Sequence, residues 1–311
     1  YRRDTKDILA PGATPLPAIL GTGAPLQNTA SLRSKGYEVE LTYQDHIGSD
    51  IQFRISANLS DNTAVITRFD GNPTKVLSTY YVGQQIGSIW GYTTNGFYTV
   101  NDFVKGSISP NLTGGTLLPN IPKFQGENPN PGDIMYKDYN GDGVVYQGLN
   151  TADSSGDMRI IGNSSPRYIF GLNGSISYKD FTFSFVLSGV GKQDLAMANP
   201  LIFPNYNQFA TVYANELNYW TPTNTNAYFG RIYDQAAGNQ NFNELTQTRF
   251  LQNGAYLRIN NLTLDYGLPI SLLKKVYITS LHIFCSVENP FLFDHLPTRI
   301  RAGIGKPGDG D

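Results

Sequence analysis

The feature that most constrains this chain is a pair of alternating segments joined by a two-residue turn, SPRYIFGLNGSISYKDFTFSFVLSGVG at residues 165–191. Side chains alternate between the faces of a β-strand, so each segment has one aromatic or aliphatic face and one face of Ser, Thr, Asn and Gly. Charged residues gather at the turn, Lys179-Asp180. A large apolar face opposite a small polar face is typical of a membrane-barrel hairpin, with lipid outside and a wet lumen inside.

A second alternating pair spans residues 36–58 and turns near His46–Asp50. Its polar face carries Glu38, Glu40 and Arg54. Charges of this kind fit either a solvated sheet surface or a lumen wall. Because two such hairpins occur in one chain, we expect these residues to line the lumen.

A third hairpin is predicted within residues 250–288. The alternation shifts by one residue at Asn260-Asn261, which predicts a β-bulge. Pro269 is expected to end the first strand, and the turn falls near Leu273–Lys275. The second strand alternates from Tyr277 and is expected to end at Asn289-Pro290, with Cys285 on its apolar face.

The rest of the chain is rich in Pro, Gly and Asn, and we expect it to form long loops. Residues 2–32 are predicted to be a loop throughout, whereas Phe209, Val212, Tyr213, Leu217 and Trp220 have the spacing of a short helix that ends before Pro222. Short turns lie on the periplasmic side of such barrels, so segments 1–35, 62–165 and 190–249 would be extracellular. Their aromatic residues can stack on a substrate or simply fill the fold. The candidates for substrate contact are Trp90, Tyr92 and Trp220.

The spacing Asp138-x-Asn140-x-Asp142-Gly143 matches the first half of a calcium-binding loop. Oxygen ligands at positions one, three and five would converge on the ion, and the glycine at position six permits the sharp bend. Position twelve is Leu149 in place of the usual Glu, so Asp153 or Asp157 would have to complete the coordination. The alternative is a turn that is rich in Asp and Gly and needs no ion.

Several functional classes are excluded by what the sequence lacks. The net charge of −2 leaves no basic footprint for nucleic acid. The single cysteine, Cys285, predicts neither a disulfide nor a cysteine metal site. The histidines are far apart, and no nucleophile elbow or phosphate-binding loop occurs, so we expect no enzymatic activity and no required cofactor.

Short strings in a shared order resemble SusC-like TonB-dependent transporters. They include LRSKGYEVEL at residues 32–41, GQQIGSIWGY at 83–92, GDIMYKD at 132–138 followed by NGDG, IGNSSP at 161–166, YWTP at 219–222 and GAYLRINNLTLDY at 254–266. The insertion at residues 147–157 departs from the family pattern, where further acids close the loop quickly.

This resemblance implies that residues 1–311 are the C-terminal portion of an antiparallel transmembrane β-barrel in the bacterial outer membrane. The barrel would be 22-stranded, roughly the size at which the lumen is plugged, and the plug and earlier strands would precede Tyr1. The resemblance also implies uptake of oligosaccharides or peptides, powered through TonB, with a SusD-like lipoprotein as partner and with lipid around the barrel.

The alternative is a soluble extracellular β-sandwich, a lectin-like glycan-binding module, because alternating strands with long loops also fit that fold. The apolar strand faces distinguish the two. A sandwich buries them against a second sheet, whereas a barrel leaves them facing lipid.

Overall fold

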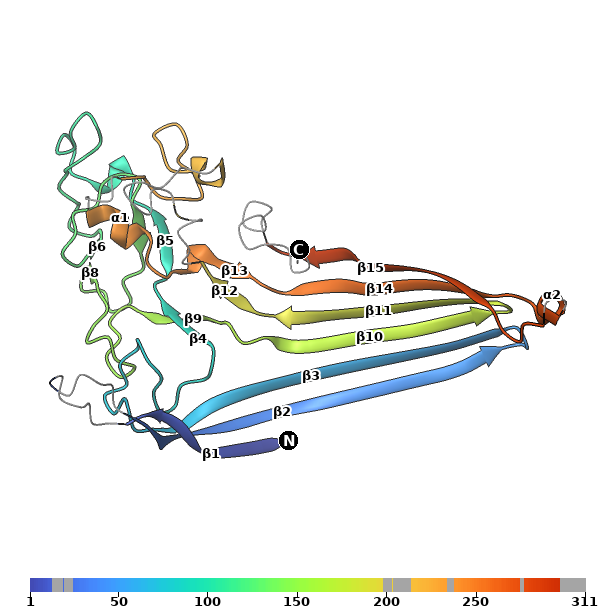
Figure 1. The fold of residues 1–311 in the computed structure, drawn as a ribbon. Helices are drawn as coiled ribbons and strands as arrows, with labels where there is room; N and C mark the ends of the chain where they lie inside the picture. Colours follow the sequence, from blue (N-terminus) through green and yellow to red (C-terminus); the bar gives the residue numbers. More distant parts are fainter. Residues whose placement is uncertain are drawn as a thin grey trace.

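In the computed structural model, long strands run side by side, with helix α2 (Ile270–Leu273) at one of their ends and the other short elements at the opposite end (Figure 1). The structure describes residues 1–12, 25–197, 214–233, 238–274 and 277–296, together with Ile19 and Phe203. Seven antiparallel strands form the main sheet in the order β1-β2-β3-β10-β11-β14-β15. Their bounds are Arg2–Pro11 (β1), Leu26–Ile47 (β2), Ile51–Phe69 (β3), Arg167–Tyr178 (β10), Phe181–Lys192 (β11), Tyr256–Gly267 (β14) and His282–Asp294 (β15).

The first two predicted hairpins are confirmed. β10 and β11 pair from Arg167↔Lys192 to Tyr178↔Phe181, so Lys179-Asp180 is the turn, and Lys179 takes the left-handed conformation with φ 53°. β2 and β3 pair down to Ile47↔Ile51, and the turn between them contains Gly48 with φ 63°. Positive φ at these turn positions matches the twist of a tight hairpin connection.

The third hairpin is confirmed with two changes. The predicted bulge is present, because Ile259 pairs with Leu187 and Asn261 with Val186, which leaves one residue unpaired between them. The partner strand β15 begins at His282 rather than Tyr277 and continues through Asn289-Pro290 to Asp294. Asn289 has φ 48° beside a register shift, so this dipeptide bends the strand instead of ending it.

The prediction that residues 2–32 form a loop is wrong. β1 pairs with β2 from Arg2↔Lys35 to Pro11↔Leu26, and β2 therefore begins before the predicted hairpin. Charged residues hide the alternation of β1: Asp4 accepts hydrogen bonds from Arg2 on the same strand and from Arg33 on the neighbouring strand β2. Pro11 is compatible with this strand because it lies at the strand's end, where no ladder hydrogen bond is lost.

The two faces of the main sheet differ as the sequence predicts. Register pairs Leu41 with Ala57, Ala57 with Leu172 and Leu172 with Leu187, which makes a continuous apolar row across four strands. Arg54 instead pairs with Ser175, and Ser175 with Ser184, on the polar face. Aromatic residues on the apolar face remain exposed, including Tyr43, Tyr178, Phe181 and Phe183.

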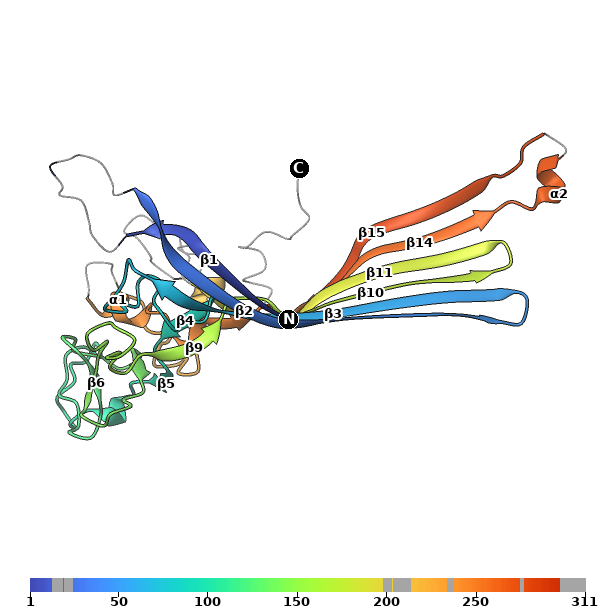
Figure 2. The same ribbon diagram turned by 90° about the horizontal axis from the view of Figure 1, so that it is seen from below.

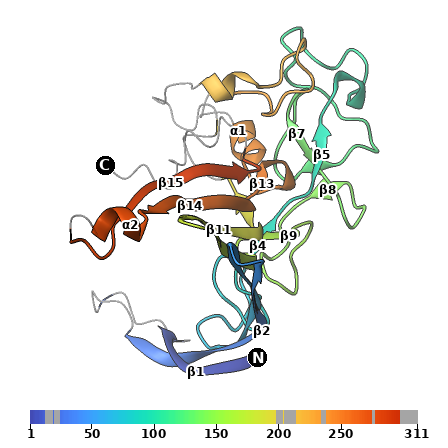
Figure 3. The same cartoon turned by 90° about the vertical axis from the view of Figure 1, so that its right-hand side faces the viewer.

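Viewed along the strands, the sheet is bent, with β1 and β2 at one end and β14 and β15 at the other (Figure 3). Its edges, β1 and β15, are not joined, so the chain forms an open portion of a barrel wall. In the described ranges the remaining sheets have only two strands each, and they lie beyond one end of the long strands rather than over a face of the main sheet (Figure 2). The β-sandwich alternative therefore lacks the second sheet that it needs.

The segments between β3 and β10 and between β11 and β14 fold into what we call the loop module. Its strands pair as β4 with β9, β5 with β7, β6 with β8 and β12 with β13. The bounds of its elements are Ser88–Gly91 (β4), Thr94–Phe97 (β5), Val100–Asp102 (η2), Lys123–Phe124 (β6), Ile134–Tyr136 (β7), Val144–Val145 (β8), Arg159–Asn163 (β9), Asp194–Ala196 (β12), Ala214–Leu217 (η3), Gly238–Asn243 (α1), Thr248–Phe250 (η4) and Leu251–Asn253 (β13).

Helices are short wherever the structure describes them. Of the predicted helix around residues 209–220, Phe209, Val212 and Tyr213 lie outside the described residues, and the described part is the 3-10 helix η3, which ends before Pro222. Helix α2, Ile270–Leu273, occupies the predicted turn after β14. Within the described residues, no helix has the length and apolar character needed to span a membrane.

Candidate ligand-binding pocket in the loop module

The loop module has its own hydrophobic core, although its segments carry little alternation. Nine buried residues from sequence-distant segments form it: Tyr92, Ile134, Tyr136, Val145, Met197, Phe203, Phe229, Phe242 and Phe250. Rings of this core pack edge-to-face, as between Phe203 and Phe250 at 4.8 Å, and the partly buried Phe124 stacks on Phe242 at 5.7 Å. Aromatic pairs of this kind give the module a defined shape without long strands or helices.

Asp133 is the polar centre of this core and is fully buried. Its carboxylate accepts hydrogen bonds from the Asn130 backbone N–H at 2.7 Å, from Asn239 Nδ2 at 2.6 Å and from Asn243 Nδ2 at 2.9 Å. Burial raises the pKa of Asp133, and these donors oppose that rise. The network ties the segment before β7 to helix α1, which lies more than 100 residues later in the chain.

The Asp-Gly loop is closed by its own hydrogen bonds. Asp138 accepts the backbone N–H groups of Asn140, Gly141 and Gly143, while Asn140 Nδ2 donates to Asp142 at 2.9 Å. The two acids proposed to complete a calcium shell are engaged elsewhere. Asp153 pairs with Lys75 at 3.0 Å, and buried Asp157 accepts the N–H groups of Tyr139 and Tyr146.

A calcium ligand set in this loop would therefore consist of Asp138, Asn140 and Asp142 alone. Within the described ranges no group of three or more His, Cys, Asp or Glu residues could hold a metal ion. The donors fit calcium only in part, because that ion usually takes six to eight oxygen ligands. Calcium at this loop stays a prediction from the sequence.

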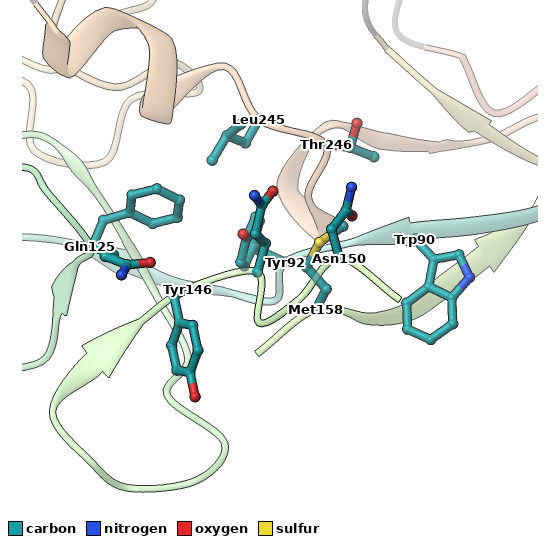
Figure 4. A pocket seen from close by; sticks show the side chains of 10 residues that line it. Trp90, Tyr92, Gln125, Tyr146, Asn150, Met158, Leu245 and Thr246 are labelled. Carbon is teal, nitrogen blue, oxygen red and sulfur yellow. The ribbon is translucent and has the colours of Figure 1, made fainter. Parts of the chain in front are cut away.

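A pocket of about 380 Å³ lies beside the aromatic core (Figure 4). Trp90 stands on one side of it and Tyr146 on the other, with Tyr92 and Asn150 between them. The full lining is Trp90, Tyr92, Phe124, Gln125, Tyr146, Gln147, Asn150, Met158, Leu245 and Thr246. The lining combines flat rings with amide and hydroxyl groups and contains no charged side chain, which is chemistry suited to an uncharged polar part of a ligand.

Two predicted contact residues, Trp90 and Tyr92, meet at this pocket. The Trp90 indole donates to the Tyr81 hydroxyl at 3.0 Å, which fixes the ring at the wall. Tyr92 is 5% exposed, and among the described residues its hydroxyl has no hydrogen-bond partner. Burial, with a smaller effect of the Asp157 charge, raises the pKa of Tyr92 to about 12. A buried hydroxyl without a protein partner is costly unless something in the pocket bonds it.

The third predicted contact residue, Trp220, lies away from this pocket. It is 6% exposed and covers Gly132, whose φ is 96° and where an added Cβ would lie 2.2 Å from the indole ring. Trp220 packs on Gly132 and also borders a second pocket with Phe97 and Arg249, so substrate contact by Trp220 stays a prediction. Sequence reasoning did not single out Gln125, Asn150 or Arg249, because nothing in the local pattern marks them as neighbours of Trp90 or Trp220.

The fold and this site define the wall of an antiparallel β-barrel that carries a folded loop module at one end. No family model matches the chain. It is 27% identical over 96% of its length to the TonB-dependent receptor P3 of Formosa agariphila, and 24% identical over 98% to the TonB-dependent receptor SusC of Bacteroides thetaiotaomicron. Among solved structures, the RagAB peptide transporter covers 95% of the chain with a TM-score of 0.62 and 18% identity.

These similarities confirm the resemblance inferred from the short strings: the chain is homologous to SusC-like TonB-dependent receptors. They also confirm the fold class, because the likeness to the RagAB chain covers nearly the whole sheet and loop module. The chain spans about 28% of the length of the two receptors and 29% of the RagAB chain.

Proposed function

We propose that this chain is the C-terminal portion of an outer-membrane importer that takes up nutrients in a TonB-dependent manner. The observation that carries the proposal is the two-faced main sheet: a continuous apolar face with exposed aromatic residues, opposite a face of Ser, Thr, Asn and Gly. Because no second sheet covers the apolar face in the described residues, lipid is the environment that would cover it, with water against the other face. The similar TonB-dependent receptors also support the role of an importer. The sequence is consistent with this role, because no group of residues in it has the spacing of a catalytic motif.

The loop module would then lie on the extracellular side, opposite the short hairpin turns. We propose that its substrates are oligosaccharides or peptides and that a SusD-like lipoprotein closes over it. Trp90 and the Tyr92 hydroxyl would contact the substrate in the uncharged pocket. One similar structure, RagAB, is described as a peptide transporter, and this supports a substrate of peptide size.

The test begins with the intact gene product. We expect a polypeptide more than three times as long as this chain, extracted from outer membranes only by detergent and purified together with a surface lipoprotein. Deleting its gene should abolish growth on the oligosaccharide or peptide that it imports, and a TonB mutation should have the same effect. A soluble product of this length would overturn the proposal.

A further inference from the structure

The second pocket of the loop module contains a cation, Arg249, that has no counter-ion among the described residues. Arg249 is the middle residue of the 3-10 helix η4. It donates from Nε to the Tyr228 carbonyl at 2.6 Å and from Nη2 to the Ala227 carbonyl. Its guanidinium lies over the Phe97 ring at 4.5 Å. These contacts hold the plane of the group in one orientation, yet they occupy only two of its five N–H donors.

Within the described residues, Arg249 forms no salt bridge with an Asp or Glu. Burial lowers the pKa of Arg249, and no carboxylate acts against that effect. By contrast, Arg167, Arg68 and Arg33 each pair with an aspartate. Partly burying a cation costs free energy that neutral carbonyls and a ring only partly offset, so this site is electrostatically incomplete.

Arg249 lines a pocket of about 400 Å³. Apolar walls from Phe97, Val100, Leu112, Trp220 and Pro222 surround it, and Thr99, Thr225 and Asn226 add polar groups. Its volume is within the range of pockets that hold small molecules, about 300–1,000 Å³. Apolar walls strengthen an ion pair inside the pocket because they exclude water.

We propose that this pocket binds a carboxylate group of the ligand, with Arg249 as its anchor. A planar carboxylate can accept two parallel N–H bonds from a fixed guanidinium, which is the strongest neutralising contact that this geometry offers. The inference rests on the proposed function for the identity of the ligand. It adds that the ligand carries a carboxylate, either a uronic acid within an oligosaccharide or the C-terminal carboxylate of a peptide.

The experiment is isothermal titration calorimetry on the purified full-length transporter. Two carboxylate probes, tetragalacturonic acid and N-acetyl-Ala-Ala-Leu, are compared with their neutral forms, the methyl ester and the C-terminal amide. We expect one acid to bind at least about tenfold more tightly than its neutral form, as expected for a charge-assisted contact. Which acid binds identifies the source of the carboxylate.

Arg249→Met should remove this preference and leave the affinity for the neutral form unchanged. The matched control is Arg159→Met, which removes an arginine that also bonds two carbonyl groups and lies over a ring, Tyr139, but does not line this pocket. It should keep the preference. Circular dichroism checks that each variant is folded. If the Arg249→Met variant does not fold, the comparison of the acid with its neutral form in the wild-type protein still tests the proposal.

Equal affinity for acid and neutral form, or no binding of either acid at millimolar concentration, would overturn the proposal. So would an Arg249→Met variant that is folded and keeps the preference. The proposed function is tested separately, by membrane location and by TonB-dependent growth. Either of those tests can fail while the purified protein still binds the carboxylate probe.

Discussion

Replacing Leu41 with arginine tests the lipid-facing assignment of the sheet most directly. Leu41 is 69% exposed in this open sheet, so the substitution removes few protein contacts. In a soluble protein, a change at such a position alters the free energy of unfolding by no more than about 0.5 kcal/mol. In a membrane barrel the same position would face hydrocarbon, and the two environments therefore predict different results.

The magnitude follows from where Leu41 lies in the apolar band. Tyr168 and Tyr178 are ten residues apart on the apolar face, about 33 Å along a strand that rises roughly 3.3 Å per residue. At a tilt of about 40° this corresponds to roughly 25 Å across the membrane, the usual height of the apolar band. The row that joins Leu41 to Leu172 falls near its middle, where an arginine costs about 2–4 kcal/mol.

The assay is unfolding of the full-length protein in lipid vesicles by guanidinium chloride, with the temperature at which the barrel loses compact migration in detergent gels as a second readout. Glu40→Arg is the matched control, because Glu40 is the adjacent exposed residue on the opposite, polar face. We expect the control to stay within about 0.5 kcal/mol of wild type. The lipid-facing assignment is refuted if Leu41→Arg destabilises the barrel no more than the control does.

Four further changes probe the loop module. Asp157→Ala should destabilise the module by about 2 kcal/mol or more, because the backbone N–H groups of Tyr139 and Tyr146 lose the carboxylate that accepts them. Hydrogen exchange at these two residues would report the loss, and unchanged protection there would contradict this role. Gly132→Ala should displace the indole of Trp220 and shift its fluorescence to the red, whereas an unchanged spectrum would show that the backbone yields instead. Calcium should raise the melting temperature of wild type but not of an Asp138→Ala, Asp142→Ala double variant, and equal melting of wild type in calcium and in chelator would remove the ion from this loop. Finally, because the pKa of Tyr92 is raised to about 12 in the fold, its neutral hydroxyl stabilises the fold at lower pH, and this contribution is lost as pH rises from about 10 through about 12. The melting temperature of Tyr92→Phe should therefore fall less steeply than that of wild type over this pH interval.

The hairpins could be predicted from the sequence because the signals that specify them are local. Alternation at residues 167–192 fixes which face is apolar, and the turn Lys179-Asp180 fixes the register that the structure shows. The bulge at Asn260-Asn261 was visible for the same reason, as a one-residue change of phase. β1 could not be predicted in this way, since its charged residues pair with Arg33 and Lys35 across the sheet and break the alternation.

The loop module could not be predicted because its stability depends on contacts between distant segments. Tyr136 donates to the Phe242 carbonyl, and Asp133 accepts from Asn239 and Asn243. No window of the sequence contains both partners of these contacts. The resemblance to known transporters pointed to a loop region, but it did not indicate which aromatic residues form its core.

The same separation explains why the sequence singles out aromatic residues that line a pocket but not Arg249, which lines another. Trp90 was chosen because rings stack on substrates, and it does line a pocket. Arg249 looks ordinary in sequence, because most arginines are paired or solvated. Only the folded module shows that its neighbours are the carbonyls of residues 227 and 228 and the ring of Phe97. The two pockets thus present different chemistry, because the lining of one has no charged side chain and the other contains the Arg249 guanidinium.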